Sequence, residues 1–169
     1  MTLDKLANWT IVVSMPFLVA LVGYNLTRNP TSDRNREIES KIKNAKLTLV
    51  GEKDGDEAIG IFLSPECRFC TESAPTYKKF LAAAQNGKMR VVGIFQEPES
   101  AARAYTGGLG YELHRYVSPD SVGMTERVPT PTMVLVNRKG EVKRMWIGRP
   151  TPAVEKEVLD IVAGQGNRG

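Results

Sequence analysis

The sequence contains two cysteines, Cys67 and Cys70, with two residues between them. Two thiols at this spacing could bind a metal, form a structural cross-link, or exchange electrons through a reversible disulfide. Structural zinc sites use four Cys or His ligands, and the only histidine, His114, is far away in the sequence. A disulfide that closes so short a loop constrains the unfolded chain little, so it would stabilise a domain of this size weakly. The pair therefore favours redox exchange, with no metal and no cofactor.

The segments around the cysteines predict how the two thiols are positioned. The apolar run 58–63 is typical of a strand buried on both faces, and residues 74–84 show the apolar spacing of a helix. Cys67 would then lie at a helix N-terminus, where unpaired N–H groups and the helix dipole favour a thiolate. We predict that Cys67 is the nucleophile and that Cys70, one helical turn later, resolves the mixed disulfide.

From Lys46 onward the sequence alternates between strand-like and helix-like segments. We expect strands at 46–50, 58–63, 89–95, 112–117, 132–136 and 141–147, and helices at 74–84, 98–108 and from Thr151 to the end of the domain. Residues 137–140 have the composition of a hairpin turn. Thr151 followed by Pro152 predicts an N-cap and a first helical residue.

The N-terminal part of the chain contains an uncharged, mostly apolar run at residues 9–26. Its 18 residues are near the lower limit for crossing a bilayer. A buried core helix and a cleaved signal peptide are the alternatives, but the run is apolar all round and lacks small residues at a cleavage site. We expect a tail at 1–8, a transmembrane signal anchor at 9–26, a charged linker with a short helix at 27–45, and a folded domain at 46–169.

Length and charge limit the other classes of function. The chain has 169 residues, enough for one ordinary domain, and its net charge is +4. Lysines and arginines are dispersed among acidic residues without interleaved aromatics, so we expect no nucleic-acid partner.

The chain from about Lys46 to Val162 resembles thioredoxin-fold proteins. The features that carry the likeness are the cysteine pair followed by Pro75, the segment VPTPTMVLVNRKGEV at 128–142, and the order of strands and helices. With its N-terminal anchor, the chain is similar to membrane-tethered TlpA-like thiol–disulfide oxidoreductases. The resemblance implies a thioredoxin-like three-layer α/β/α fold with a mixed central sheet.

The resemblance also implies a substrate-binding segment. It places the family's cis-proline at Pro131, beside the cysteine pair, and makes the backbone of Thr130 the partner of a substrate strand. The alternative is a proline that only introduces a strand, since Pro129 and Pro131 both precede one.

Four positions depart from the family pattern. The dipeptide between the cysteines is Arg68-Phe69 instead of the Gly-Pro of thioredoxin. Arg68 would stabilise a thiolate at Cys67, the alternative being a solvated surface charge, whereas Glu66, in place of the usual tryptophan, would disfavour that thiolate. Both are therefore predicted to tune the reactivity of that thiol. Ile61 stands where thioredoxins carry a buried acid, so the proton must be handled by water or by another acid.

The resemblance implies cysteine-containing client proteins and an upstream redox donor or acceptor as partners. Because disulfides persist outside the cytoplasm, we expect a single-pass inner-membrane protein with its folded domain in the periplasm. The basic residues that follow the anchor favour the opposite orientation. Two other functions compete, a non-catalytic binding or assembly module and a peroxiredoxin-like peroxidase. The peroxidase motif would use Ser64 and Cys67 but requires a proline at position 60, where the chain has Gly60.

Overall fold

The computed structural model describes residues 30–51, 57–85, 89–124 and 127–164. The predicted anchor at 9–26 lies outside these residues. Among the helices that are described, none is long and apolar enough to cross a membrane. The chain divides into two units between Glu37 and Ile38, and the second unit contains the whole sheet.

The helix predicted in the linker is present as α2, which spans Pro30–Asn44. Within it, Lys43 and Glu39 form an i,i+4 ion pair, with 2.7 Å between Nζ and Oε1. Ile42, near the end of α2, is fully buried among residues of the sheet. The last turns of α2 therefore contribute to the core of the second unit.

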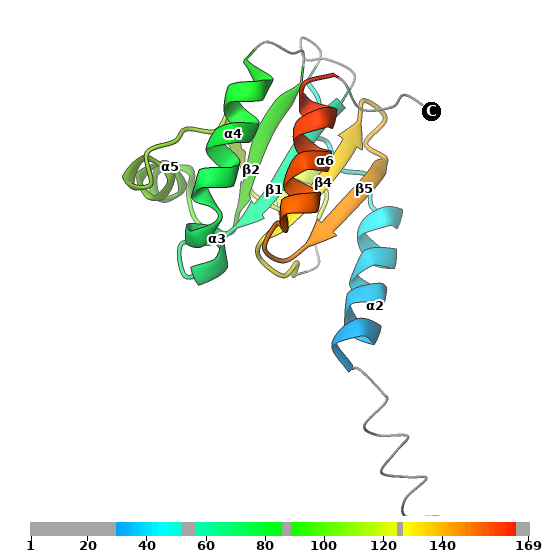
Figure 1. Ribbon diagram of the computed structural model, residues 1–169. Coiled ribbons are helices and arrows are strands. Elements are labelled where there is room, and N and C mark those ends of the chain that lie inside the picture. The colour runs from blue at the N-terminus through cyan, green and yellow to red at the C-terminus, as the bar shows by residue number, and fades with distance from the viewer. Residues whose placement is uncertain (1–29, 52–56, 86–88, 125–126, 165–169) are drawn as a thin grey trace, which may run out of the picture. The chain divides into compact units, whose positions relative to one another are not determined.

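The described strands form one mixed sheet, as predicted (Figure 1). In chain order they are β1 (Glu57–Leu63), β2 (Arg90–Phe95), β3 (Arg115–Val117), β4 (Thr132–Asn137) and β5 (Val142–Ile147). Their order in the sheet is β3-β2-β1-β4-β5, with β1, β2 and β3 parallel and with β4 antiparallel to both β1 and β5. The strand that leads to the cysteines, β1, is thus the central strand.

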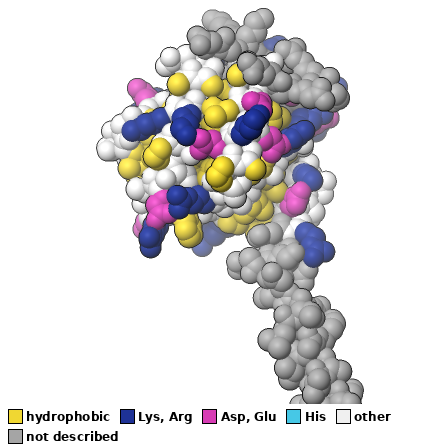
Figure 2. Space-filling model, viewed as in Figure 1, with side chains coloured by type: hydrophobic (Ala, Val, Ile, Leu, Met, Phe, Trp, Pro, Cys, Tyr) yellow, Lys and Arg dark blue, Asp and Glu magenta, His cyan; other side chains and the backbone are white. Residues whose placement is uncertain are grey.

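The remaining helices flank this sheet. They are α3 (Arg68–Glu72), α4 (Ala74–Ala84), α5 (Glu99–Gly108) and α6 (Pro152–Val162), with a short 3₁₀ turn at Asp120–Val122. Helices α4 and α6 lie side by side over one face (Figure 1). The predicted cap of α6 is confirmed, because the Thr151 hydroxyl accepts a hydrogen bond from the Val154 N–H. On the surface over these helices, charges of both signs are interspersed (Figure 2).

The two faces of the sheet are covered differently. Alternate residues of β1, such as Ile59 and Ile61, pack against α3, α4 and α6. The other face packs against the end of α2 and against segments without regular structure, which include Leu47 and Leu49.

The prediction of a strand at residues 46–50 is wrong. The segment forms isolated backbone hydrogen bonds instead of a ladder, from the Leu47 N–H to the Gly140 carbonyl (2.9 Å) and from the Thr48 N–H to the Val122 carbonyl (3.2 Å). Leu49 fills space over β1 that only a glycine leaves open, since a Cβ at Gly60 would lie 2.6 Å from Leu49 Cδ1. The apolar residues of this segment thus cover the sheet and do not extend it.

Candidate active site at the cysteine pair

The first cysteine lies where the sequence predicts it, between the end of β1 and the start of a helix. Cys67 is the N-cap of α3 and has an extended backbone, with φ −86° and ψ 103°. Its Sγ accepts a hydrogen bond from the Cys70 N–H at 3.2 Å. Because α3 ends at Glu72 and α4 begins at Ala74, the helical region is divided at Ser73, two positions before Pro75.

The two thiols have different surroundings. Cys67 is partly exposed, whereas Cys70 is fully buried. Burial, and next the hydrogen bond with Cys67, raise the pKa of the Cys70 thiol to about 12, although the Ser64 backbone and the Thr130 side chain act in the opposite direction. Cys70 is therefore a neutral thiol at physiological pH.

The fold brings the predicted substrate-binding segment to the cysteines. Cys67 Sγ donates a hydrogen bond to the backbone carbonyl of Thr130 at 3.3 Å, across 63 positions of sequence. The Thr130–Pro131 peptide bond is cis, as the resemblance implied, and Pro131 is buried directly before β4. Thr130 itself is only half-buried, so part of it is accessible beside Cys67.

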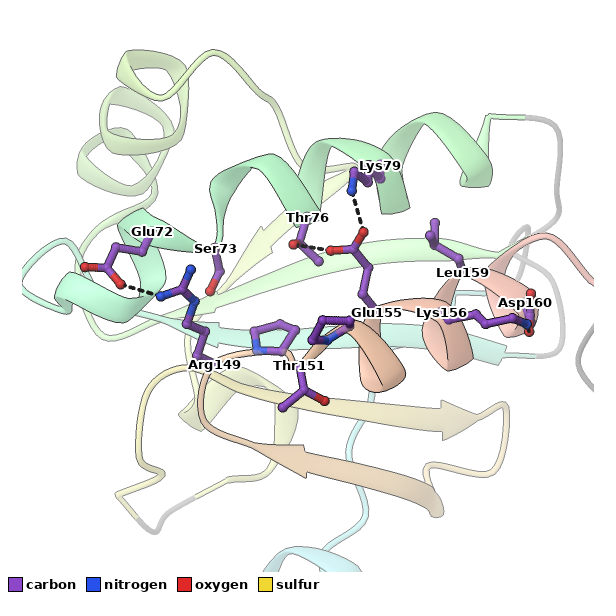
Figure 3. Close-up of a pocket in the computed structure, with 12 residues that line it drawn as sticks. Glu72, Ser73, Thr76, Lys79, Arg149, Thr151, Glu155, Lys156, Leu159 and Asp160 are labelled. Carbon is purple, nitrogen blue, oxygen red and sulfur yellow. Dashed lines mark hydrogen bonds and ion pairs between the residues drawn. The ribbon is translucent and has the colours of Figure 1, made fainter.

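Arg68 and Glu66, the residues predicted to tune the reactivity of the Cys67 thiol, are both on the surface. Arg68 extends into solvent and pairs with Glu72, with 2.7 Å between its Nε and Oε1 of Glu72. Arg149 reaches the other oxygen of the same carboxylate at 2.9 Å, as Figure 3 shows. Glu66 is exposed, and its backbone N–H donates to Ser64 Oγ at 3.3 Å. The positive charge of Arg68 is thus paired with the negative charge of Glu72.

A carboxylate that the sequence interpretation missed lies on the other side of the motif. Ser64, the residue after β1, donates a hydrogen bond from its hydroxyl to Glu97 Oε1 at 3.1 Å. Glu97 follows β2, which pairs with β1 in parallel, so the ends of both strands meet at one edge of the sheet. The sequence signal was an acidic residue two positions after a predicted buried strand.

A shallow groove of about 800 Å³ runs between α4 and α6, starting beside α3 (Figure 3). Within it Glu155 binds Thr76 Oγ1 at 2.6 Å and Lys79 Nζ at 2.5 Å, and these hydrogen bonds lower the pKa of Glu155. They connect α6 to α4. Among the described residues, no three His, Cys, Asp or Glu side chains are close enough together to hold a metal ion.

The fold of this chain is similar to that of several solved structures. StoA from Bacillus subtilis is 16% identical, with a TM-score of 0.52 over 69% of this chain and 92% of StoA. The thioredoxin domain of a thiol-disulfide oxidoreductase from Bacteroides vulgatus is 15% identical, with a TM-score of 0.51 over 66% of this chain and 82% of that one. A thioredoxin family thiol:disulfide interchange protein from Chlorobium tepidum is 17% identical, with a TM-score of 0.51 over 66% and 82%.

No family model and no curated protein matches the sequence. The structural matches show that the chain has a thioredoxin-like α/β fold. At these identities they establish the fold alone.

Proposed function

We propose that the protein is a thiol–disulfide oxidoreductase in which Cys67 and Cys70 exchange a disulfide with cysteines of partner proteins. The observation that carries this proposal is the asymmetry of the pair. Cys67 is a partly exposed N-cap whose Sγ bonds the Cys70 N–H and the Thr130 carbonyl, and Cys70 is buried one turn later. An accessible thiol attacks, and a shielded neighbour resolves the product.

The proposed reaction conserves electrons and protons. The Cys67 thiolate attacks one sulfur of a client disulfide, which forms a mixed disulfide and releases the first client thiolate. Cys70 releases its proton to solvent or to the first client thiolate, and its own thiolate attacks Cys67 Sγ, which releases the second client sulfur as a thiolate. The dithiol is oxidised to a Cys67–Cys70 disulfide, the client is reduced by the same two electrons, and reversal of these steps oxidises a client.

The surface around Cys67 supports a polypeptide client. Phe69, between the cysteines, is 54% exposed, whereas the other large hydrophobic side chains of the described residues are not exposed. An exposed aromatic beside the attacking thiol offers apolar contact to a client chain, and the half-buried Thr130 offers its backbone. In this proposal residues 9–26 anchor the domain to the inner membrane on the periplasmic side, where disulfides persist. An upstream redox partner returns the Cys67–Cys70 pair to its starting oxidation state.

The peroxidase alternative has less support. Gly60, which stands where that motif requires proline, lies inside β1 and pairs with Val92 and Val134. The Ser64 hydroxyl, which would have to activate peroxide, donates to Glu97.

The test of the proposal is a redox titration. We expect a reversible two-electron Cys67–Cys70 couple when the protein is equilibrated in glutathione buffers and its thiols are alkylated and counted by mass spectrometry. A potential near −270 mV would make the protein a reductant like thioredoxin, and one near −120 mV an oxidant like DsbA. If no Cys67–Cys70 disulfide forms at any potential, the proposed function is wrong.

A further inference from the structure

The groove between α4 and α6 starts beside α3, next to the cysteine pair. Glu72, in α3, and Arg149, in the loop after β5, bind each other across this end of the groove (Figure 3). The same loop contacts the predicted substrate-binding segment, because the Gly148 N–H donates a hydrogen bond to the Pro131 carbonyl at 2.7 Å. A client chain held at Cys67 therefore lies next to the opening of the groove.

Ion pairs line this groove, and in each of them the basic side chain is nearer to solvent than its acidic partner. The pairs, with the exposed fraction of each side chain, are Arg149 (58%) with Glu72 (29%), Lys79 (58%) with Glu155 (22%), and Lys156 (77%) with Asp160 (42%). Arg68 is a second base on Glu72, so four bases meet three carboxylates. The groove thus presents its cations outward and holds its carboxylates deeper.

Other ion pairs on the surface show a smaller imbalance or the reverse. The side chains of Lys143 and Glu141 are equally exposed, and Arg144 exceeds its partner Glu157 by less than each base in the groove exceeds its acid. At α5, both acids that bind Arg103 are more exposed than the arginine. The outward cations therefore mark the groove as a surface for an anionic partner.

The rest of the lining suits a polypeptide better than a nucleic acid. Pro150, Pro152 and Leu159 add apolar surface between the charged groups. None of the described residues that line the groove is aromatic, so a nucleic-acid base would have no ring on which to stack. An extended peptide with aspartate or glutamate side chains matches both the apolar contacts and the cations.

We propose that the groove between α4 and α6 binds an acidic segment of the client polypeptide, beside the disulfide that Cys67 attacks. The inference rests on the proposed function and names its class of client. Lys79, Lys156 and Arg149 each have more N–H donors than one ion pair uses, so they can bind client carboxylates while they remain paired. Charges at the rim of an interface act mainly on the rate of association and on the choice of partner.

The test compares three peptide disulfides as substrates of the reduced full-length protein. Each is a disulfide-linked dimer of a peptide with one cysteine, flanked on both sides by aspartates, by lysines or by serines. The rate constant for each peptide is divided by its rate constant with dithiothreitol. This ratio removes the effect of the flanking charges on the disulfide itself and on its attack by any thiolate.

The variant that tests the groove is Lys79→Gln/Lys156→Gln, which removes two outward charges from α4 and α6. Lys139→Gln/Lys143→Gln is the matched control, because it removes two exposed lysine charges from the β4–β5 hairpin. Both double variants have the same net charge, so a difference between them reports on position.

We expect the parent to reduce the aspartate peptide at least about fivefold faster than the serine peptide at low ionic strength, and the lysine peptide most slowly. The preference should nearly vanish in 1 M salt, where the Debye length is about 3 Å. Lys79→Gln/Lys156→Gln should lower the aspartate-to-serine ratio at least about threefold, and the control should keep the parent ratio.

Equal normalised rates for the aspartate and serine peptides in the parent would overturn the inference and leave the proposed function intact. An equal loss of preference in the control variant would also overturn it, because net charge and not the groove would then select the client. If equal rates accompany a dimer that Lys156→Glu dissociates, the groove belongs to a second copy of the chain, and the inference is wrong.

If the double variant in the groove melts at a lower temperature, Lys156→Gln alone gives a second test. Its side chain is the most exposed of those that line the groove in these pairs, and its removal should still lower the aspartate-to-serine ratio, whereas an unchanged ratio would contradict the inference. Failure of the parent to react with any of the three peptides would contradict the proposed function itself.

Discussion

Cys67 and Cys70 are separated by less than one helical turn, but they belong to different regions of the molecule. Cys67 is in the partly exposed turn between β1 and α3, in contact with the Thr130 carbonyl. Cys70 is buried in the same core cluster as Tyr77 and Phe80 of α4. The comparison teaches that one short helix, which begins after Cys67, is enough to give two identical side chains different accessibility. The predictions that follow test this difference.

The largest effect is expected from removing the accessible thiol. Cys67→Ser should reduce the rate of disulfide exchange with oxidised glutathione at least about 1,000-fold, because the remaining thiol is buried and protonated. The rate is measured from the thiol released. Exchange by Cys67→Ser at a rate close to the parent would mean that Cys70 can attack directly.

Alkylation should distinguish the two thiols in the unaltered protein. At pH 8, iodoacetamide should modify Cys67 at least about 100-fold faster than Cys70, because the thiolate is the reactive form and Cys70 is inaccessible. Peptide mapping of the reduced protein at successive times measures both rates. The same experiment in urea is the control, since unfolding should make the rates similar.

The buried thiol should also affect stability at alkaline pH. The pKa of Cys70 is higher in the folded state than its ordinary value of 9.0, so its contribution is fully present below pH 9 and is lost as the pH rises toward 12. The difference in unfolding free energy between the reduced parent and Cys70→Ala should therefore shrink by up to about 1 kcal/mol between pH 8 and pH 10. Urea unfolding at both pH values measures this, and a constant difference would contradict the buried position of Cys70.

The smallest effect is expected at the ion pairs beside Cys67. Glu72→Ala releases Arg68 and Arg149, whose side chains are 86% and 58% exposed, so stability should change by less than about 1 kcal/mol. The rate of glutathione exchange should change less than about threefold, with Glu112→Ala at the Arg103 pair as the control. A tenfold change in Glu72→Ala alone would show that these charges act on the attacking thiol.

The sequence analysis predicted most of the helices and strands whose formation depends on residues close together in the chain. The cap at Thr151, the helix at 74–84 and the strand before the cysteines follow from spacing and residue type, which act within a few positions. The proximity of Pro131 to the cysteines came from the family resemblance.

Features that depend on distant contacts were not predicted. Residues 46–50 have a strand-like composition, but β1 already has neighbours on both sides, β2 and β4, so the segment packs across the sheet. Glu97 and Ser64 are 33 positions apart, and Arg149 and Glu72 are 77 positions apart. Nothing in the local sequence of any of these residues identifies its partner.

The most direct test of the central claim, that Cys67 attacks and Cys70 resolves, is trapping with oxidised glutathione. Cys70→Ser is incubated with this disulfide, and the product is digested and mapped by mass spectrometry. We predict one glutathione per molecule, attached to Cys67 and stable because the resolving thiol is absent. A Cys70→Ser protein that remains unmodified, while Cys67→Ser acquires glutathione on Cys70, would contradict the account.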